Sequence, residues 1–342
     1  MKKFIAIIFI GIAFAYSLKA QVLKNDIFTQ NGNPVVTYQM SEISGTERDK
    51  LDKKYVGVHA NTIPIILYPP YYSTNLFNCH GYTFLKEKGW PDRWLGLKIG
   101  NNDPDIYISD GSYYKVPSAV YPGIVFYDRP FDHSAVTTPT TATTNIVISK
   151  WIDGPLMQHE LGVGPNFGTS WKFYALTPPI TGPSVLCYGS SGIYTISLHP
   201  AVTVTWDKST NLSINGSGNS ISVTANDNGS GFLIAKADGV NVKTYKVFVG
   251  PPSDLTVSGP TYKKAGSTFL FTATTASDLT SISWTITPSK GTTLYPDGKN
   301  CLIYFSSLSA NLTYTVKSTA NNQCGQVTAS HSIDIGPYSG EY

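Results

Sequence analysis

Cysteine and histidine are the residue types of this chain best suited to act as nucleophile, base or metal ligand. Four cysteines and six histidines occur in 342 residues. Cys79 opens the stretch Cys-His-Gly-Tyr, and Asn78 before it is a favourable helix N-cap. A thiolate in the first helical turn is stabilised by free backbone N–H groups and by the helix dipole. The pattern predicts Cys79 as a nucleophile, with a buried, inert thiol as the alternative.

A cysteine nucleophile needs an imidazole base and a third group that orients the imidazole. The stretch Asp-His-Ser-Ala-Val at residues 132–136 places His133 at the start of a predicted strand. His80 is the competing histidine, but successive helix residues diverge by about 100°. We therefore expect His80 to point elsewhere and predict His133 as the base.

The third group is predicted from a hairpin between strands at residues 133–138 and 145–151. A turn centred near residues 141–142 places His133 opposite Lys150, which has no acceptor atom for an imidazole N–H. Ser149 beside it is the predicted third member. The alternatives for this role are Asp153 and His159.

Acyl transfer also needs hydrogen-bond donors for the oxyanion. The backbone N–H of Cys79 is one expected donor, and a second is expected upstream, from Tyr72 or Asn75. Aromatic residues most often form core or cleft walls. The residues predicted to contact substrate as a secondary role are Asp110, Tyr113 and Trp151.

We expect neither a metal nor a cofactor. The stretch His-Glu-Leu-Gly-Val-Gly at residues 159–164 lacks the second histidine of a zinc-protease helix. Cys79 and His80 have no second ligand pair at zinc-like spacing. The glycine-rich stretches at residues 215–220 and 226–231 lack the Lys-Ser/Thr pair of a phosphate-binding loop.

Residues 1–20 read as a secretory signal, with Lys2 and Lys3 before an apolar run and a small residue, Ala20, at its end. Three of the 25 Lys and Arg residues lie in this segment, so 22 remain against 22 Asp and Glu. This balance argues against nucleic-acid binding, which needs clustered basic residues. We expect a secreted, periplasmic or cell-surface protein without a membrane span after signal removal.

The composition predicts three domains after the signal. Residues 21–60, with a short helix at about 46–55, form either an N-terminal arm or a propeptide. Residues 61–180 form the domain that bears Cys79, whose helix is expected to run from Cys79 to Lys88, before Gly89. Short alternating runs then predict two all-β immunoglobulin-like sandwiches at residues 181–250 and 251–342.

Two further features concern these sandwiches. A tryptophan early in each unit, Trp206 and Trp284, indicates a diverged repeat. Cys301 and Cys324 fall in the same C-terminal segment and could pair, whereas Cys79 and Cys187 have no obvious local partner.

The stretches "CHGY" and "DHSAV" resemble papain-like hydrolases of bacterial cell walls. The nearest type is the cysteine, histidine-dependent amidohydrolase/peptidase (CHAP), with NlpC-type peptidases as cousins. The stretch "ISKWIDGPLMQH" at residues 148–159 resembles secreted Bacteroidetes proteins in which such a domain precedes immunoglobulin-like or PKD-like modules.

The resemblance covers residues 61–178 and implies an α+β papain-like fold, in which the helix bearing Cys79 packs on an antiparallel sheet. It implies a cysteine hydrolase of amide bonds, with peptidoglycan or a related peptide as substrate, Cys79 as nucleophile and His133 as base. The immunoglobulin-like modules would contact a cell-surface polymer or act as spacers. The alternative is a non-catalytic surface or adhesion protein that uses the same domains for binding.

Overall fold

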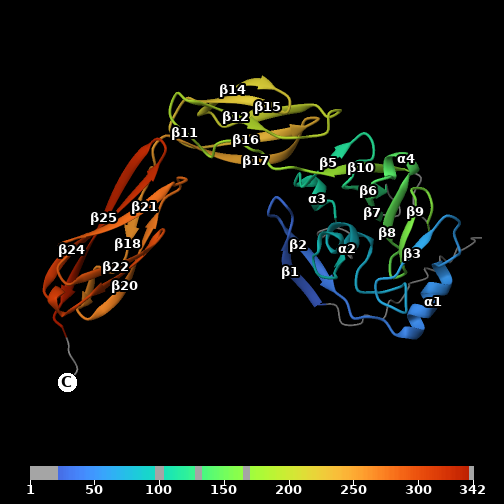
Figure 1. Ribbon diagram of the computed structural model, residues 1–342, viewed down its shortest axis with the longest axis horizontal. Helices are drawn as coiled ribbons and strands as arrows, with labels where there is room; N and C mark the ends of the chain where they lie inside the picture. Colours follow the sequence, from blue (N-terminus) through green and yellow to red (C-terminus); the bar gives the residue numbers. More distant parts are fainter. Residues whose placement is uncertain (1–21, 97–103, 128–132, 165–169, 339–342) are drawn as a thin grey trace, which may run out of the picture. The chain divides into compact units, whose positions relative to one another are not determined.

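The computed structural model describes residues 22–96, 104–127, 133–164 and 170–338. The predicted signal segment lies outside the described residues. The chain divides into two compact units, Met1–Leu176 and Thr177–Tyr342 (Figure 1). Within the described residues, no helix has the length and apolarity that a membrane crossing requires.

The first unit is organised around a seven-stranded antiparallel sheet with strand order β3-β9-β8-β7-β6-β10-β5 (Figure 1). Its strands are β3 (Ile63–Ile65), β5 (Tyr113–Val116), β6 (Gly123–Tyr127), β7 (His133–Thr137), β8 (Ile146–Lys150), β9 (Leu156–Glu160) and β10 (Trp171–Leu176). A separate three-stranded sheet contains β1 (Val22–Phe28), β2 (Pro34–Gln39) and β4 (Trp94–Leu95).

The helices of the first unit are short. They are α1 (Gly45–Tyr55), α2 (Cys79–Phe84), α3 (Ile106–Ser109), α4 (Thr141–Thr144) and the 3₁₀ helix η1 (Lys86–Lys88). α2 packs against β7 and β8 and starts at the residue that the capping pattern predicts. It stops at Phe84 because Leu85 leaves the helical conformation, and η1 then leads to Gly89 in the left-handed conformation.

The predicted α+β papain-like class is wrong. Strands make up 51% of the described residues and helices 10%, and the longest described helix, α1, has 11 residues. The sequence explains this outcome, because charged residues are only 14% of the chain and its apolar runs are rich in β-branched and aromatic residues. The helix that bears Cys79 is a six-residue element on a predominantly β protein.

The second unit confirms the prediction of two immunoglobulin-like β-sandwiches. The first pairs the sheets β11-β17-β16-β13 and β12-β15-β14. Its strands are β11 (Val185–Leu186), β12 (Ser191–Thr195), β13 (Val204–Lys208), β14 (Leu212–Ser217), β15 (Ser220–Ala225), β16 (Gly229–Ala237) and β17 (Val240–Val249).

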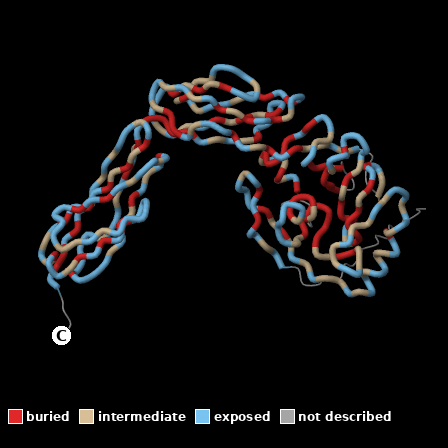
Figure 2. Tube along the Cα trace, in the orientation of Figure 1, coloured by how far each residue is buried: buried red, intermediate tan, exposed pale blue. Residues whose placement is uncertain are grey.

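The second sandwich pairs the sheets β18-β20-β23-β22 and β19-β25-β24-β21. Its elements are β18 (Thr256–Ser258), β19 (Tyr262–Lys264), β20 (Ser267–Thr274), β21 (Ser281–Thr287), β22 (Thr292–Asp297), β23 (Asn300–Phe305), η2 (Ser307–Ser309), β24 (Leu312–Asn322) and β25 (Gly325–Gly336). Buried and exposed positions alternate along its strands (Figure 2), as a sheet with one buried face requires.

The two tryptophans that indicate a repeat occupy equivalent places. The indole N–H of Trp206 on β13 donates to the carbonyl of Gly218, between β14 and β15, at 2.8 Å. That of Trp284 on β21 donates to the carbonyl of Gly298, between β22 and β23, at 3.1 Å. Each tryptophan thus ties one sheet of its sandwich to a hairpin turn of the other.

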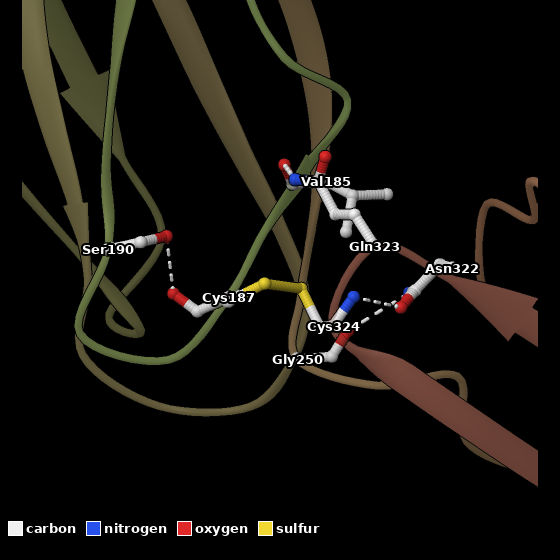
Figure 3. Close-up of a disulfide and its surroundings, with 7 residues drawn as sticks. All are labelled: Val185, Cys187, Ser190, Gly250, Asn322, Gln323 and Cys324. Atoms are coloured by element: carbon white, nitrogen blue, oxygen red, sulfur yellow. Dashed lines mark hydrogen bonds between the residues drawn. A yellow bond between two sulfur atoms is a disulfide. The ribbon is translucent and has the colours of Figure 1, made fainter.

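A disulfide joins the two sandwiches, and it differs from the expected pair. Cys187 is bonded to Cys324 across 137 residues of sequence (Figure 3). Beside it, the Gln323 side chain donates to the carbonyl of Val185 at 2.6 Å. Cys301 is instead a free thiol in the core of the second sandwich. It lies on β23 with its side chain inward, so proximity in sequence to Cys324 did not bring the two thiols together.

The packing of α2 gives a stability prediction. A Cβ added to Gly81 would lie 1.9 Å from the carbonyl oxygen of Arg93. Ala normally stabilises a helix by about 1 kcal/mol relative to Gly, but overpacking costs about 1–3 kcal/mol. We expect Gly81→Ala to lower the free energy of unfolding by about 2 kcal/mol.

Denaturant unfolding of the full chain measures this change. The reaction of Cys79 with a thiol reagent, in a Cys301→Ser background, is the signal that reports unfolding. Gly162→Ala is the matched control, since no atom lies within 4 Å of its added Cβ. A stabilised Gly81→Ala protein would contradict the close packing of α2 on the Arg93 backbone.

Candidate functional site

Asn78 fixes the start of α2. Its Oδ1 accepts from the backbone N–H of Gly81 at 2.8 Å and of Leu95 at 3.2 Å. Its Nδ2 donates to the carbonyl of Leu95 at 2.6 Å. One buried side chain therefore caps the helix and joins it to β4, which places Cys79 in the first turn of α2.

The thiol of Cys79 is buried among polar groups. Burial alone would raise its pKa, and the side chain is only 6% exposed. Attraction to the His80 imidazole, a hydrogen bond from that ring and hydrogen bonds from the backbone of Ser134 and His80 outweigh burial. They lower the pKa of Cys79 below its ordinary value, which favours the thiolate.

His80 is the imidazole that the structure places beside Cys79. Its Nδ1 lies 2.8 Å from the Oγ of Ser134 on β7, and its ring stacks on Phe126 of β6 at 5.7 Å between centroids. Both His80 and Ser134 are buried. Cys79, His80 and Ser134 therefore form a cluster of thiol, imidazole and hydroxyl between α2 and β7.

The structure does not bring His133 to this cluster. Neighbouring strand residues point to opposite faces, and the Ser134 side chain reaches α2. His133 accordingly lies on the far face, with its ring 5.1 Å from that of Tyr127. Tyr127 belongs to a separate core cluster with Ala135. The structure therefore places His80, and not the predicted His133, beside Cys79.

A one-residue difference in register accompanies this correction. β7 and β8 do form the predicted hairpin, but Val136 pairs with Ile148 and Thr137 with Val147. Continuing this register puts His133 opposite Trp151 rather than Lys150, and a slip of one residue exchanges the two faces of a strand.

Two candidates for the third catalytic member gather on the far face. The Ser149 Oγ lies 2.7 Å from the Nε2 of His159, and both residues are fully buried. Burial, with a smaller contribution from the nearby His133, lowers the pKa of His159 to about 4, so its ring is neutral at physiological pH. Asp153, in the turn between β8 and β9, acts electrostatically on Lys150. The side-chain partner of the His80 Nδ1 is instead Ser134.

The predicted upstream oxyanion donors are already engaged. The backbone N–H of Tyr72 donates to Asp52 at 3.1 Å, and that of Asn75 donates to Glu42 at 2.9 Å. Both carboxylates come from residues 21–60, which were expected to be either an arm or a propeptide. This segment also pairs through β2 with β4, so in the structure it is an integrated arm.

The three residues predicted to contact substrate make contacts within the fold instead. The Asp110 carboxylate accepts from Thr29, Asn33 and the backbone of Ser112, which anchors the turn after β1. Tyr113 is buried against Phe84, and burial raises the pKa of its hydroxyl. Trp151 is fully buried, with its ring edge against Tyr55 and His59.

Sequence reasoning did not consider Ser134, and it weighed His80 and Lys150 but gave them no role. Ser134 adjoins His133 in the quoted stretch, so only the choice of strand face separates the two readings. Lys150 closely follows the apolar run Ile146–Ile148, where a charge is unusual, and that is the one signal that pointed to it.

An open cavity of about 440 Å³ lies elsewhere, at the β3–β9–β8 edge of the sheet. Its lining residues are Asn61, Thr62, Ile63, Ile146, Gln158, His159 and Glu160. It borders His159 but not Cys79. In the described part of the chain, no three His, Cys, Asp or Glu side chains gather in a way that would hold a metal ion.

Comparisons with known proteins identify no family. No protein-family model and no curated protein matches the chain. Among solved structures, the mouse nectin-like molecule 4 ectodomain (Ig1–Ig3) is 12% identical, with 68% of this chain and 97% of that chain covered and a TM-score of 0.27. The titin Ig tandem A164–A165 is 13% identical, with 47% and 97% covered and a TM-score of 0.25. The chicken CNTN1 FN1–FN3 domains are 12% identical, with 48% and 67% covered and a TM-score of 0.28. Scores this low carry no argument about function.

The site predicts a thiol that reacts at unusually low pH. In a Cys301→Ser protein, we expect the rate of Cys79 alkylation by iodoacetamide to have a pH midpoint below the ordinary value of about 8.5. His80→Gln removes the imidazole and should raise the midpoint by about one unit, a tenfold loss of thiolate below neutral pH.

His133→Gln is the matched control, because it alters a histidine on the far face of the same strand. We expect its midpoint to equal that of the parent protein. A shift in His133→Gln with none in His80→Gln would restore the sequence-based assignment and refute the geometry described above.

Proposed function

We propose that the first unit is a cysteine amidohydrolase or peptidase in which Cys79 is the nucleophile and His80 the general base and acid. The observation that carries the proposal is the pairing of a buried, low-pKa thiol with a histidine that Ser134 orients. Thiolate, imidazole and orienting group are the three parts that nucleophilic catalysis by cysteine requires.

The reaction proceeds by acyl transfer. The Cys79 thiolate attacks the amide carbonyl carbon, and the backbone N–H of Cys79 at the start of α2 stabilises the oxyanion. The C–N bond breaks as the imidazolium of His80 gives its proton to the amine. His80 then removes a proton from water, whose oxygen attacks the thioester and releases the carboxylate product and the thiolate. Nδ1 is bonded to Ser134, so Nε2 exchanges these protons.

Peptide amide bonds of peptidoglycan are the proposed substrate, and export is the proposed destination. The motif "CHGY" and its resemblance to the CHAP and NlpC-type hydrolases support the substrate class. The Cys187–Cys324 disulfide supports export, since disulfides persist mainly in oxidising compartments. The immunoglobulin-like modules would hold the first unit near its polymer.

A second candidate, non-catalytic binding at a surface, is favoured by two observations. Cys79 is only 6% exposed, so a substrate has little access to its thiol in this conformation. On the second sandwich, Leu270, Leu302 and Tyr295 are directly opposite one another on β20, β23 and β22 and are 51%, 45% and 57% exposed. An apolar row on an outer sheet face is suited to contact with a partner.

The enzyme proposal is tested by the release of new amino groups from purified peptidoglycan. We expect Cys79→Ala to abolish activity and His80→Ala to lower it by about 10²–10⁴-fold, the usual contribution of a general base. His133→Ala should retain activity. An inactive parent protein, or activity that survives Cys79→Ala, would reject this proposal.

The binding candidate is tested by co-sedimentation of the full chain with peptidoglycan. Leu302→Ser interrupts the apolar row, and we expect it to reduce the bound fraction several-fold if the row makes the contact. Phe232→Ser, at an exposed apolar position on the first sandwich, is the matched control and should bind as the parent does. Equal binding by all three proteins would exclude the row as the contact surface.

A further inference from the structure

Lys150 ends β8 and is fully buried, at 0% exposure. Among the residues that the structure describes, it is the only buried lysine, arginine, aspartate or glutamate. A buried ammonium is disfavoured because it loses its hydration. A methionine of similar length would fill the same space without that loss, so packing alone does not account for the charge.

The turn between β8 and β9 holds this ammonium. Nζ donates to the carbonyl oxygens of Ile152 at 2.7 Å and Gly154 at 2.6 Å. Ile152 has a φ of 57°, which a β-branched residue rarely adopts. Gly154 packs so closely that an added Cβ would lie 2.7 Å from the ring of Tyr55. The turn is therefore fixed in a shape that presents two carbonyls to one ammonium.

Lys150 lies on the face of the sheet that α2 covers. The register that pairs Val136 with Ile148 puts Lys150 opposite Ser134, whose hydroxyl is bonded to His80. The Lys150 Nζ is 5.5 Å from the ring centroid of Phe77, two residues before Cys79. The ammonium is thus beside the cluster of Cys79, His80 and Ser134.

Four acidic groups act on Lys150, namely Asp153, Cys79, Glu42 and Asp52. Burial lowers the pKa of Lys150 and attraction to these four groups opposes it, with a net pKa of about 7. Glu42 and Asp52 already accept hydrogen bonds from the loop that precedes α2. Cys79 differs from the other three because the proposed reaction forms and consumes its negative charge.

We infer that Lys150 is a positioning residue that supplies a second positive charge behind the Cys79 thiolate. The inference rests on the proposed function, in which that thiolate is the nucleophile. Attraction between the Lys150 ammonium and the Cys79 sulfur favours the thiolate before it attacks and again when the acyl group departs.

Lys150→Gln tests the role of the charge, because a glutamine amide can still donate to the two turn carbonyls. We expect the pH midpoint of Cys79 alkylation to rise by about one unit, which is about tenfold less thiolate below neutral pH. Lys86→Gln is the matched control. Its Nζ is 5.0 Å from the same Phe77 ring, but it is partly exposed and paired with Asp92. An unchanged midpoint in Lys150→Gln overturns the inference.

A measurement on the unsubstituted side chain covers the case in which Lys150→Gln fails to fold. Coupling between two sites is reciprocal, so capping Cys79 with methyl methanethiosulfonate should lower the pKa of Lys150. Nuclear magnetic resonance of isotope-labelled lysine Nζ groups reports that titration, and an unchanged pKa overturns the inference.

The two claims fail separately. If the protein lacks amidase activity but Lys150→Gln raises the pH midpoint of Cys79 alkylation, only the proposed function is rejected. If the protein is active but Lys150→Gln leaves that midpoint unchanged, only the role of Lys150 is rejected.

Discussion

The hydrogen bonds of Asn78 are the constraint on which the rest of the first unit depends. Its amide caps α2 through Gly81 and exchanges two hydrogen bonds with the Leu95 backbone. A six-residue helix is too short to be stable alone, so tertiary contacts must hold it. Because this side chain fixes α2 against β4, Cys79 meets β7 at Ser134, and the neighbouring His80 can reach both. A cluster of three polar residues is thereby placed between α2 and the sheet face that also carries Lys150.

A single side chain has a similar role in each sandwich of the second unit, where one indole N–H donates a hydrogen bond from one sheet to a hairpin turn of the other. These features were predictable because they are local. The N-cap Asn78, the left-handed Gly89 and the period-2 alternation around Trp206 and Trp284 are visible within about ten residues of sequence. The position of α2 and the two sandwiches followed from them.

The features that were missed depend on distant parts of the chain. Whether His133 or Ser134 faces α2 depends on the strand register, and one residue exchanges the faces. The partner of Cys324 is 137 residues away, and no local pattern encodes it. Lys150 was set aside as an orienting group because its side chain accepts no hydrogen bond. Its burial against the turn after β8 cannot be read from the sequence. The prediction of a papain-like α+β fold was wrong for a similar reason, because two short motifs do not determine how much helix surrounds them.

The central claim is that Cys79 and His80 form a thiolate–imidazole pair, and the ultraviolet absorbance of the thiolate measures it at equilibrium. The difference spectrum between Cys301→Ser and the Cys79→Ala/Cys301→Ser double variant isolates Cys79 across a pH titration. The structure predicts a thiolate that forms below the ordinary thiol pKa of about 8.5 and a normal or higher titration in His80→Gln. A Cys79 absorbance that appears only at or above that value, with or without His80, would contradict the account.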